Sequence, residues 1–227
     1  MAILSLQKEW EVLLNSVSEL QKSLQIHLKL RKSVHHYRFL MDKKEIRKTL
    51  KEKRRNIPKE KKVIYDNAIS ERIVNSVYFK LARQVLVFSS TDDEFDTKHI
   101  IERCREENKR IFYPLCIDNM GNMKFFRVDS PDDLQVGMYG ISEPKPYCRE
   151  YTPQENDVII VPCLSVDENG YRIGYGKGYY DRFLKEFNGV SNCPCYEELL
   201  TDKLPTDKYD IKVKIIVTQN STKEVIL

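Results

Sequence analysis

The sequence predicts an α/β protein with a largely parallel central sheet covered by helices on both faces. Short apolar runs typical of strands alternate with amphipathic segments typical of helices along most of the chain. A separate amphipathic segment precedes this alternating part. No apolar stretch reaches the roughly 18 residues that a membrane helix needs, so no membrane partner is expected.

Length and composition fit one medium domain with an extension. The chain has 227 residues, and its 38 Lys and Arg nearly balance its 34 Asp and Glu, which leaves a net charge of +4. Such a balance gives no general reason to bind nucleic acid. The six cysteines match no C-x-x-C zinc pattern, so we interpret them as reduced thiols of a cytoplasmic protein. A redox role for Cys193 and Cys195 is the alternative.

The first predicted element is an amphipathic helix over residues 3–30, where apolar residues recur every three or four positions. Residues 1–41 therefore read as a helical N-terminal extension and residues 42–227 as the main domain. Acidic residues in the extension (Glu9, Glu11 and Glu19) argue against a mitochondrial presequence. Met41 offers a second start, and then residues 1–40 would be an appendage.

The main domain opens with a basic helix over residues 42–56, which Pro58 ends. Pro58 suits the first turn of the next helix, predicted to run to residue 79. An apolar run predicts a strand over 85–88, and Asp96 or Thr97 can cap a helix over 97–108. Strands follow over 110–113, where Pro114 should end the strand, and over 123–128 and 158–161. A helix over 179–187 and a strand over 213–218 complete the pattern.

The most informative segment is the glycine-rich block over residues 171–183. Gly174, Gly176 and Gly178 alternate around Lys177, with Arg172 just before them. Glycines let backbone N–H groups approach a ligand, and a following helix N-terminus favours anions, so the block predicts phosphate binding. It is not a Walker A loop, because no Ser or Thr follows the lysine, and the glycine spacing is not G-x-G-x-x-G. A plain Gly-rich turn is the simpler alternative.

Carboxylates near this block are candidate magnesium ligands. Asp181 follows the glycines, where it could hold the Mg²⁺ that accompanies a nucleotide. Asp207 and Asp210 precede the last strand and could support a metal, although solvated turn aspartates are commoner.

Two more segments contain candidate ligand-binding residues. Lys43 and Arg47 lie four residues apart on one helix face, where they can clamp a terminal phosphate. A solvated or RNA-contacting basic helix is the alternative. Glu94 lies in the loop after the 85–88 strand and can accept hydrogen bonds from a heterocycle, unless that loop is only a solvated acidic turn. Residues 137–144 read as a loop, and no nucleophile or catalytic histidine stands out.

Taken together, four segments resemble the 5-formyltetrahydrofolate cyclo-ligase family over residues 42–220. They are the basic helix start at 43–47, the loop at 88–97 with Glu94, the Gly-Met-Tyr-Gly-Ile-Ser-Glu-Pro turn at 137–144, and the run from Val161 through the glycine block to Asp181. The last segment is the most specific to the family.

The resemblance implies a three-layer sandwich of the NagB/RpiA/CoA-transferase kind. It also implies a cytoplasmic ligase of one-carbon metabolism that uses ATP and Mg²⁺ to convert 5-formyltetrahydrofolate into 5,10-methenyltetrahydrofolate, ADP and phosphate. Its partners would be these small molecules, with no nucleic acid and no membrane, and the protein would be a monomer or weak dimer.

The resemblance also implies roles for individual residues. The ATP-binding residues would be Lys43, Lys44, Glu45, Ile46, Arg47, Arg172, Ile173, Gly174, Tyr175, Gly176, Lys177, Gly178, Tyr179 and Tyr180. The folate substrate would contact Ser89, Glu94, Tyr175, Gly176, Lys177, Gly178 and Tyr179. Lys177, Arg172 and Tyr179 would be catalytic, and Asp181, Asp207 and Asp210 would hold the metal.

Some positions depart from the family pattern. Pro194 falls where an apolar central strand is expected, Lys214 stands where an aspartate is usual, and Cys163 replaces a smaller residue. Residues 1–40 have no counterpart. Three competing readings remain: an RNA-binding protein, a relative that binds without turnover, and another enzyme on the same sheet, such as a sugar-phosphate isomerase.

Overall fold

The computed structural model describes residues 43–137 and 140–226 of the chain. The predicted helix over 3–30 and the extension over 1–41 lie outside these residues. Residues 43–227 form one compact unit.

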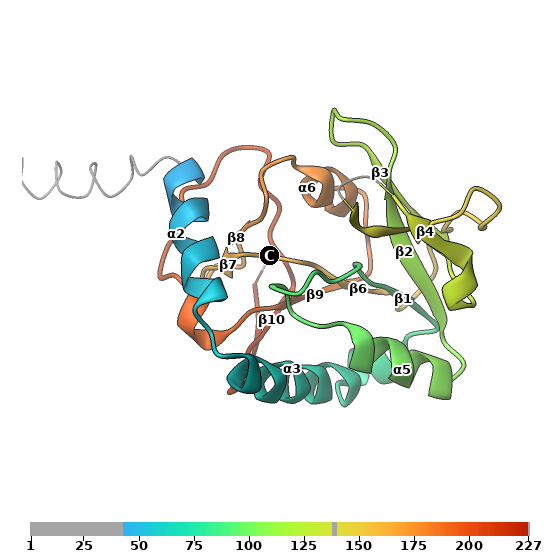
Figure 1. The fold of residues 1–227 in the computed structure, drawn as a ribbon, viewed down its shortest axis with the longest axis horizontal. Coiled ribbons are helices and arrows are strands. Elements are labelled where there is room, and N and C mark those ends of the chain that lie inside the picture. Colours follow the sequence, from blue (N-terminus) through green and yellow to red (C-terminus); the bar gives the residue numbers. More distant parts are fainter. Residues whose placement is uncertain (1–42, 138–139, 227) are drawn as a thin grey trace, which may run out of the picture. The chain divides into compact units, whose positions relative to one another are not determined.

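A seven-stranded sheet forms the centre of this unit (Figure 1). Its strand order is β11-β10-β9-β6-β1-β2-β3. The five inner strands pair in parallel, and only the edge strands β3 and β11 run antiparallel to their neighbours. The strands are β1 (Gln84–Leu86), β2 (Arg110–Cys116), β3 (Met123–Arg127), β6 (Val158–Ile160), β9 (Val190–Pro194), β10 (Ile215–Val217) and β11 (Thr222–Glu224). The predicted largely parallel sheet is confirmed.

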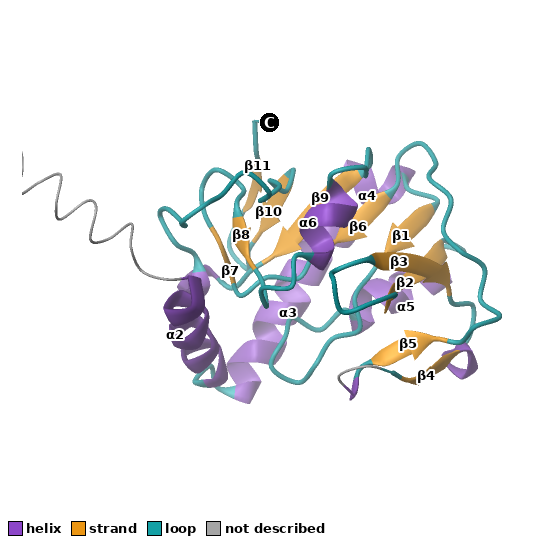
Figure 2. Cartoon of the chain, turned by 90° about the horizontal axis from the view of Figure 1, so that it is seen from above, coloured by secondary structure: helices purple, strands orange, loops and turns teal. Residues whose placement is uncertain are grey.

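Helices cover both faces of the sheet. Helices α3 (Lys59–Val74) and α5 (Lys98–Glu106) pack below it in Figure 1, while α6 (Tyr179–Leu184) lies on the other side, near β3. The view from above shows α6 in front of the sheet and α3 and α5 behind it (Figure 2). This is the three-layer arrangement that the sequence predicted. Helix α2 (Lys43–Arg55) stands beside these layers.

The core of the unit follows the apolar runs of the sequence. Every residue of β1, β6 and β10 is buried. Parallel strands covered on both faces carry continuous apolar runs rather than alternating ones, which is why these three strands stand out in the sequence.

Two boundaries differ from the sequence expectation. The predicted helix over 58–79 is two helices, because Ser76 accepts a hydrogen bond from the Phe79 backbone N–H and starts α4 (Val77–Leu81). Strand β2 continues through Pro114 to Cys116. Its pairing with β1 ends at Phe112, so the missing N–H of Pro114 removes no bond of that ladder.

Several short elements were not predicted. Strand β4 (Leu134–Val136) forms a hairpin with β5 (Ser142–Pro144), and β5 lies in the segment 137–144 that was expected to be a loop. Strand β7 (Ser165–Val166) pairs with β8 (Arg172–Ile173). Strand β9 is central despite Pro194, which is its last residue.

The structure also bears on the cysteines and on membrane helices. All six cysteines are free, and Cys193 and Cys195 are buried. Within the described residues no helix has the length and apolar character to cross a membrane.

Candidate active site

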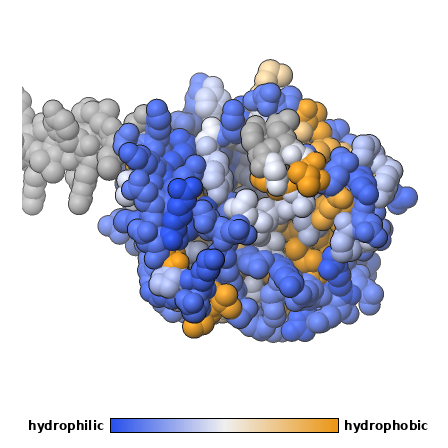
Figure 3. Space-filling view, viewed as in Figure 1, coloured by the Kyte–Doolittle hydropathy of each residue, from blue (hydrophilic) through white to orange (hydrophobic). Residues whose placement is uncertain are grey.

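A cleft of about 1180 Å³ opens at the carboxyl ends of β1 and β6. Its walls are the inner face of α2, the loop that follows β1, the glycine block and the segment 205–211. Seen from the side of Figure 1, the surface between α2 and α6 combines hydrophilic and near-neutral residues (Figure 3). Ligand sites of open α/β sheets lie at this edge, and the volume exceeds the roughly 300–1,000 Å³ of common single-ligand pockets.

Most of the residues singled out from the sequence line this cleft. From α2 and the β1 loop come Lys43, Arg47, Ser89 and Glu94; from the glycine block and the C-terminal loop come Arg172, Ile173, Gly174, Tyr175, Gly176, Lys177, Gly178, Tyr179, Tyr180, Asp181, Asp207 and Asp210. Lys44, Glu45 and Ile46 do not line it. One helix face carries positions four apart, so these three residues turn away, and Ile46 packs against the core instead.

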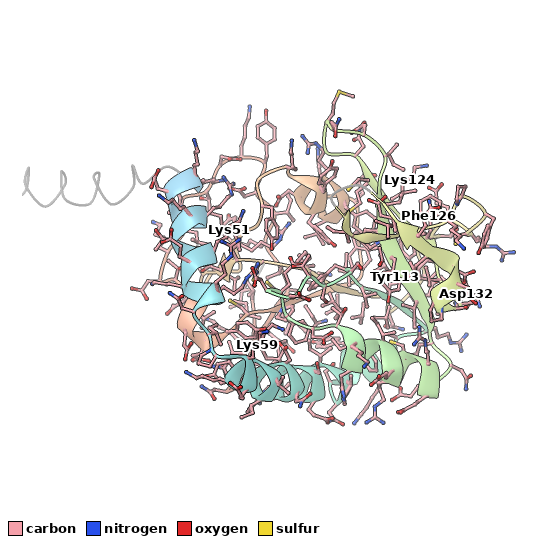
Figure 4. All side chains as sticks on the ribbon, in the orientation of Figure 1. Lys51, Lys59, Tyr113, Lys124, Phe126 and Asp132 are labelled. Atoms are coloured by element: carbon pink, nitrogen blue, oxygen red, sulfur yellow. The ribbon has the colours of Figure 1, made fainter. Side chains whose placement is uncertain are left out.

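Other lining residues escaped the sequence reasoning. Lys51 and Arg54 continue the face of Lys43 and Arg47 by a further one and two turns of α2. Figure 4 labels Lys51 on the side of α2 turned toward α6. The helical spacing was a signal that could have found both residues. Cys116 also lines the cleft, although no local pattern marks it, and so does Glu143 of the Gly-Met-Tyr-Gly-Ile-Ser-Glu-Pro turn.

The glycine block bends so that α2 can approach it. Gly176 has a φ of +98° and Gly178 one of +73°, a region that other residues enter only with strain. The guanidinium of Arg47 lies against this turn, and its Nε donates a hydrogen bond of 2.9 Å to Gly174 O. A Cβ on Gly176 would come within 2.9 Å of Arg47 Cζ. The absent side chain therefore makes room for the arginine.

Arg172 joins the glycine block to the C-terminal loop. Its side chain is only 4% exposed. Nη1 donates to Ile211 O at 2.9 Å, and Nη2 lies 3.2 Å from Asp181 Oδ1. Asp181 Oδ1 also accepts the Ile211 backbone N–H at 3.2 Å. Arg172 thus holds the two segments together, and its contacts are structural in this state.

Lys43 lies between two aspartates of the C-terminal loop. Its Nζ is 3.0 Å from Asp207 Oδ2 and 2.6 Å from Asp210 Oδ2. Burial lowers the pKa of Lys43, but the hydrogen bonds to Asp210 and Asp207 outweigh it, and the pKa is raised. The Tyr209 backbone N–H and Lys43 hold the pKa of Asp207 below its usual value. The pair therefore stays ionised at neutral pH.

The candidate metal ligands form no ready-made cluster. In the part of the chain that the structure describes, no group of three or more His, Cys, Asp or Glu side chains could hold a metal ion. Mg²⁺ bound with a nucleotide usually takes one or two carboxylates and completes its shell with phosphate and water. Hydrogen bonds from described residues reach only Oδ1 of Asp181 and only Oδ2 of Asp210. These two side chains fit that smaller role, whereas both oxygens of Asp207 have donors.

Glu94 also lines the cleft and is only 7% exposed. Its Oε2 accepts hydrogen bonds of 3.0 Å from the backbone N–H and the hydroxyl of Thr91. The carboxylate is therefore oriented by its own loop rather than solvated, and it retains acceptor capacity for a ligand.

Two further residues of the glycine block differ in their surroundings. The Tyr179 hydroxyl donates to Asp118 O at 2.7 Å, so this tyrosine links the block to the loop after β2. Lys177 is exposed and lines the cleft. An exposed ammonium beside a glycine turn is suited to neutralising phosphate charge.

Two residues that depart from the family pattern, Lys214 and Cys163, do not place their side chains in the cleft. Lys214 Nζ donates to Asn188 O and Gly189 O at 3.3 and 2.7 Å, and it does not line the cleft. Cys163 O accepts a hydrogen bond from Arg54, so its backbone and not its thiol supports the cleft.

Comparison with known proteins gives one consistent result. Residues 40–219 match the family model of the 5-formyltetrahydrofolate cyclo-ligases. The chain is 29% identical over 180 residues to 5-formyltetrahydrofolate cyclo-ligase of Escherichia coli K12, which covers 77% of this chain and 99% of that protein. It is 28% identical to the probable 5-formyltetrahydrofolate cyclo-ligase of Caenorhabditis elegans, over 79% of this chain and 94% of that protein.

Solved structures agree. The structure of Aquifex aeolicus 5,10-methenyltetrahydrofolate synthetase matches with a TM-score of 0.71 and 31% identity, over 81% of this chain and 92% of that one. A synthetase of the same name from Mycoplasma pneumoniae matches with a TM-score of 0.65 over 79% of this chain and 99% of that one. At 21% identity, that second likeness supports the fold alone.

Proposed function

This chain belongs to the 5-formyltetrahydrofolate cyclo-ligase family, and we propose that it converts 5-formyltetrahydrofolate and ATP into 5,10-methenyltetrahydrofolate, ADP and phosphate. It is thus a ligase of folate one-carbon metabolism. The observation that carries the proposal is one cleft that combines cationic side chains at a glycine turn with a buried, oriented carboxylate. The first part suits ATP phosphates and the second suits a heterocycle.

The proposed reaction needs no protein nucleophile. The formyl oxygen of the substrate attacks the γ-phosphorus of ATP, and ADP leaves with the bonding electrons. N10 then attacks the activated formyl carbon and loses its proton, and the bond between this carbon and the former formyl oxygen breaks, so that the oxygen leaves with the phosphoryl group as inorganic phosphate. Positioning and charge stabilisation can supply the catalysis of such a transfer.

The residues of the cleft have different roles in this reaction. Arg47 and Lys43 bind the terminal phosphates, with Lys43 turning from Asp210 toward the nucleotide. Lys177 neutralises the charge that develops on the transferred phosphoryl group. Glu94 accepts N–H groups of the pterin ring and so orients the formyl group toward the γ-phosphate.

Mg²⁺ belongs to the same proposal. Asp181 and Asp210 are the residues that would hold it, because each has one oxygen that no described residue uses. The ion would supply charge neutralisation between the phosphates of ATP. Asp207 would keep Lys43 in place rather than bind the ion.

A cytoplasmic protein without a nucleic-acid partner fits this function. The competing RNA-binding hypothesis relied on the basic segment 43–62, and two cations of that segment, Lys43 and Arg47, line the cleft. RNA binding that weakens steeply with salt would restore that hypothesis. Sedimentation of the purified protein would show whether it is a monomer or weak dimer.

Near-ultraviolet absorbance of the purified protein with 5-formyltetrahydrofolate tests the proposal. The product has an extended chromophore that the substrate lacks, so absorbance should rise only when both ATP and Mg²⁺ are present. Replacing ATP by its β,γ-methylene analogue is the matched control, because the analogue binds but cannot transfer its γ-phosphoryl group. A flat trace from folded protein that still binds both ligands in calorimetry would indicate a relative without turnover.

A further inference from the structure

Arg182 is a cleft residue to which the proposed reaction gives no role. It is the fourth residue of α6, its backbone N–H donates to Gly178 O, and its exposed side chain lines the cleft. The side chain turns back toward the start of its own helix, as helical side chains tend to do, and Nη1 donates a hydrogen bond of 3.0 Å to Lys177 O. A bond from a charged donor is stronger than one between neutral groups. Arg182 thus holds the backbone of the residue that the proposed function assigns to phosphoryl transfer.

This hydrogen bond restrains more than one atom, because a peptide group is planar. Lys177 O shares its plane with the Cα atoms of Lys177 and Gly178. Gly178 has a φ of +73°, and a Cβ on it would lie 2.9 Å from Arg182 Nη1, so the glycine lets the guanidinium lie close to the turn. Holding the oxygen therefore holds the point from which the Lys177 side chain projects, while that side chain stays exposed.

The turn between β2 and β3 packs against the same peptide. Its Gly121 is buried, although Met120 and Asn122 on either side are exposed. Gly121 has a φ of +98°, and an added Cβ would overlap Arg182 Nη1 and lie 2.7 Å from Lys177 O. The guanidinium and the carbonyl therefore occupy the space that a side chain at this position would need.

Hydrogen bonds fix the β2–β3 turn itself. Asp118 Oδ1 accepts the backbone N–H groups of Met120 and Asn122 at 2.8 and 3.1 Å, and Oδ2 accepts the Asn122 side-chain amide at 2.6 Å. Asp118 O accepts the Tyr179 hydroxyl at 2.7 Å, which is a second link between this turn and the glycine block. The turn is therefore a firm support for the Lys177 peptide.

We propose that Arg182 is a positioning residue that holds the Lys177 peptide against the β2–β3 turn, so that the Lys177 ammonium meets the γ-phosphate of ATP. This rests on the proposed function, since that function assigns Lys177 to the transferred phosphoryl group. Arg182 acts through the backbone and leaves the lysine side chain free to follow the moving charge. Because Arg182 lines the cleft, a direct bond from its guanidinium to the phosphates is the competing explanation.

A double-mutant cycle with K177A and R182M separates these two explanations. R182M should lower kcat about tenfold, because a misplaced catalytic group loses rate even when it is still present. The KM values for ATP and for the folate should change less than about twofold. In the K177A background, R182M should lower kcat less than about twofold further, since the residue that it positions is already gone. Tenfold losses in both backgrounds, or a KM for ATP that rises in R182M, would overturn the proposal in favour of direct binding.

Matched variants separate positioning from stability. R182K keeps a cationic donor, and one donor is enough for one carbonyl, so it should recover part of the kcat that R182M loses. Arg105 is exposed on α5, on the other face of the sheet, and does not line the cleft, so R105M should match the wild type in kcat and both KM values. A lower thermal midpoint in R182M with an unchanged kcat would mean that Arg182 is only structural.

Tryptic cleavage tests the same contact without any reaction. Trypsin cuts after Lys177, at the peptide whose oxygen Arg182 holds, and an exposed segment is cut more slowly when its backbone is held in place. Mass spectrometry of R182M and G121A should show this cut at least about fivefold faster than in the wild type. Gly140 also has a positive φ, of +70°, but no atom within 4 Å of an added Cβ, so G140A is the matched control and should be cut there at the wild-type rate. Equal rates in R182M and the wild type would contradict the proposal.

Failure of the proposed function would look different. Wild-type protein that forms no methenyl product refutes the function itself, and with it the role of the Lys177 ammonium. Faster cleavage after Lys177 in R182M would then still uphold the hold of Arg182 on the backbone. If the wild type forms the product and R182M keeps both the wild-type kcat and the wild-type cleavage rate, the role of Arg182 is refuted and the function stands.

Discussion

Lys43 and Lys177 have the same charge and line the same cleft, but their surroundings differ. Lys43 is held by two carboxylates 3.0 and 2.6 Å away, so part of its charge is already neutralised. Lys177 is exposed and forms no ion pair with any described residue. An ammonium without a fixed partner can follow the charge that moves during phosphoryl transfer, which makes Lys177 the better candidate for catalysis.

Replacing Lys177 by alanine should therefore lower kcat/KM by about 10²–10³-fold, the usual loss when one stabilising donor is removed. The thermal midpoint should stay at the wild-type value, because the side chain is exposed. Steady-state kinetics and thermal unfolding of the same samples check both statements. Lys223→Ala is the control, since Lys223 lies on the edge strand β11 away from the cleft. Near wild-type turnover in Lys177→Ala would remove this residue from the mechanism.

At the residue scale, sequence reasoning found the residues that belong to motifs. Lys177, Arg172 and Glu94 were visible because their neighbours along the chain are unusual. Arg54 was missed: its helical spacing from Arg47 marks its face of α2, but its partners Tyr175 and Cys163 lie 121 and 109 residues away. Contacts over such separations leave no local pattern. Ile46 shows the opposite error. It was predicted to bind ATP because it belongs to the segment 43–47, but it packs against the core.

Among the elements, the glycine turn contains two glycines with different conformational requirements. Gly176 adopts a φ of +98°, whereas Gly174 does not have a positive φ and would have no atom within 4 Å of an added Cβ. The two glycines are two residues apart in one loop, yet only one needs its special conformation. They form a natural matched pair for mutation.

Gly176→Ala should lower the free energy of unfolding by about 1–2 kcal/mol, the cost of the left-handed region for a residue with a Cβ. It should also displace Arg47, whose Cζ would lie 2.9 Å from the new atom, and so raise the KM for ATP. Gly174→Ala should change the unfolding free energy by less than about 0.5 kcal/mol. Urea unfolding of the two variants measures the difference. Equal stabilities would contradict the assigned backbone strain.

At the element scale, long periodic segments were predictable and short ones were not. The buried strands β1, β6 and β10 are apolar runs, and α2 and α5 have clear polar and apolar faces. The hairpin strands β7 and β8 have two residues each, too few for any period to show. The break between α3 and α4 depends on the cap formed by Ser76. The apolar residues on both sides of Ser76 continue one helical pattern, so this break cannot be seen in the sequence.

On the scale of the whole described unit, buried neutral acids limit stability at high pH. Burial raises the pKa of the Cys104 thiol from 9.0 to about 12 and that of Tyr113 from 10.0 to about 12. In the folded state these groups keep their protons above pH 9, while the unfolded chain releases them near their ordinary values. The free energy of unfolding must therefore fall as the pH rises between the ordinary and the raised pKa.

The variant Cys104→Ala should reduce this dependence. Between pH 9 and pH 10 its unfolding free energy should fall less steeply than that of the wild type, by about 1 kcal/mol per pH unit, because one linked proton is gone. Its stability at pH 7 should be lower, since a buried side chain has been shortened. Urea unfolding under reducing conditions at pH 7, 9 and 10 measures both effects. An identical slope in the two proteins would show that Cys104 is accessible to ionisation in the folded state.

The contact of Lys43 with Asp207 and Asp210 spans 164 and 167 residues. Lys43 is among the first residues of the described unit to be synthesised, and its partners are among the last. A chain emerging from the ribosome therefore cannot complete the cleft until residue 210 has been made. Chains that stop before Asp207 would have α2 and the β1 loop but no C-terminal wall for the cleft. The wide separation of these three residues thus makes ligand binding depend on both ends of the described unit.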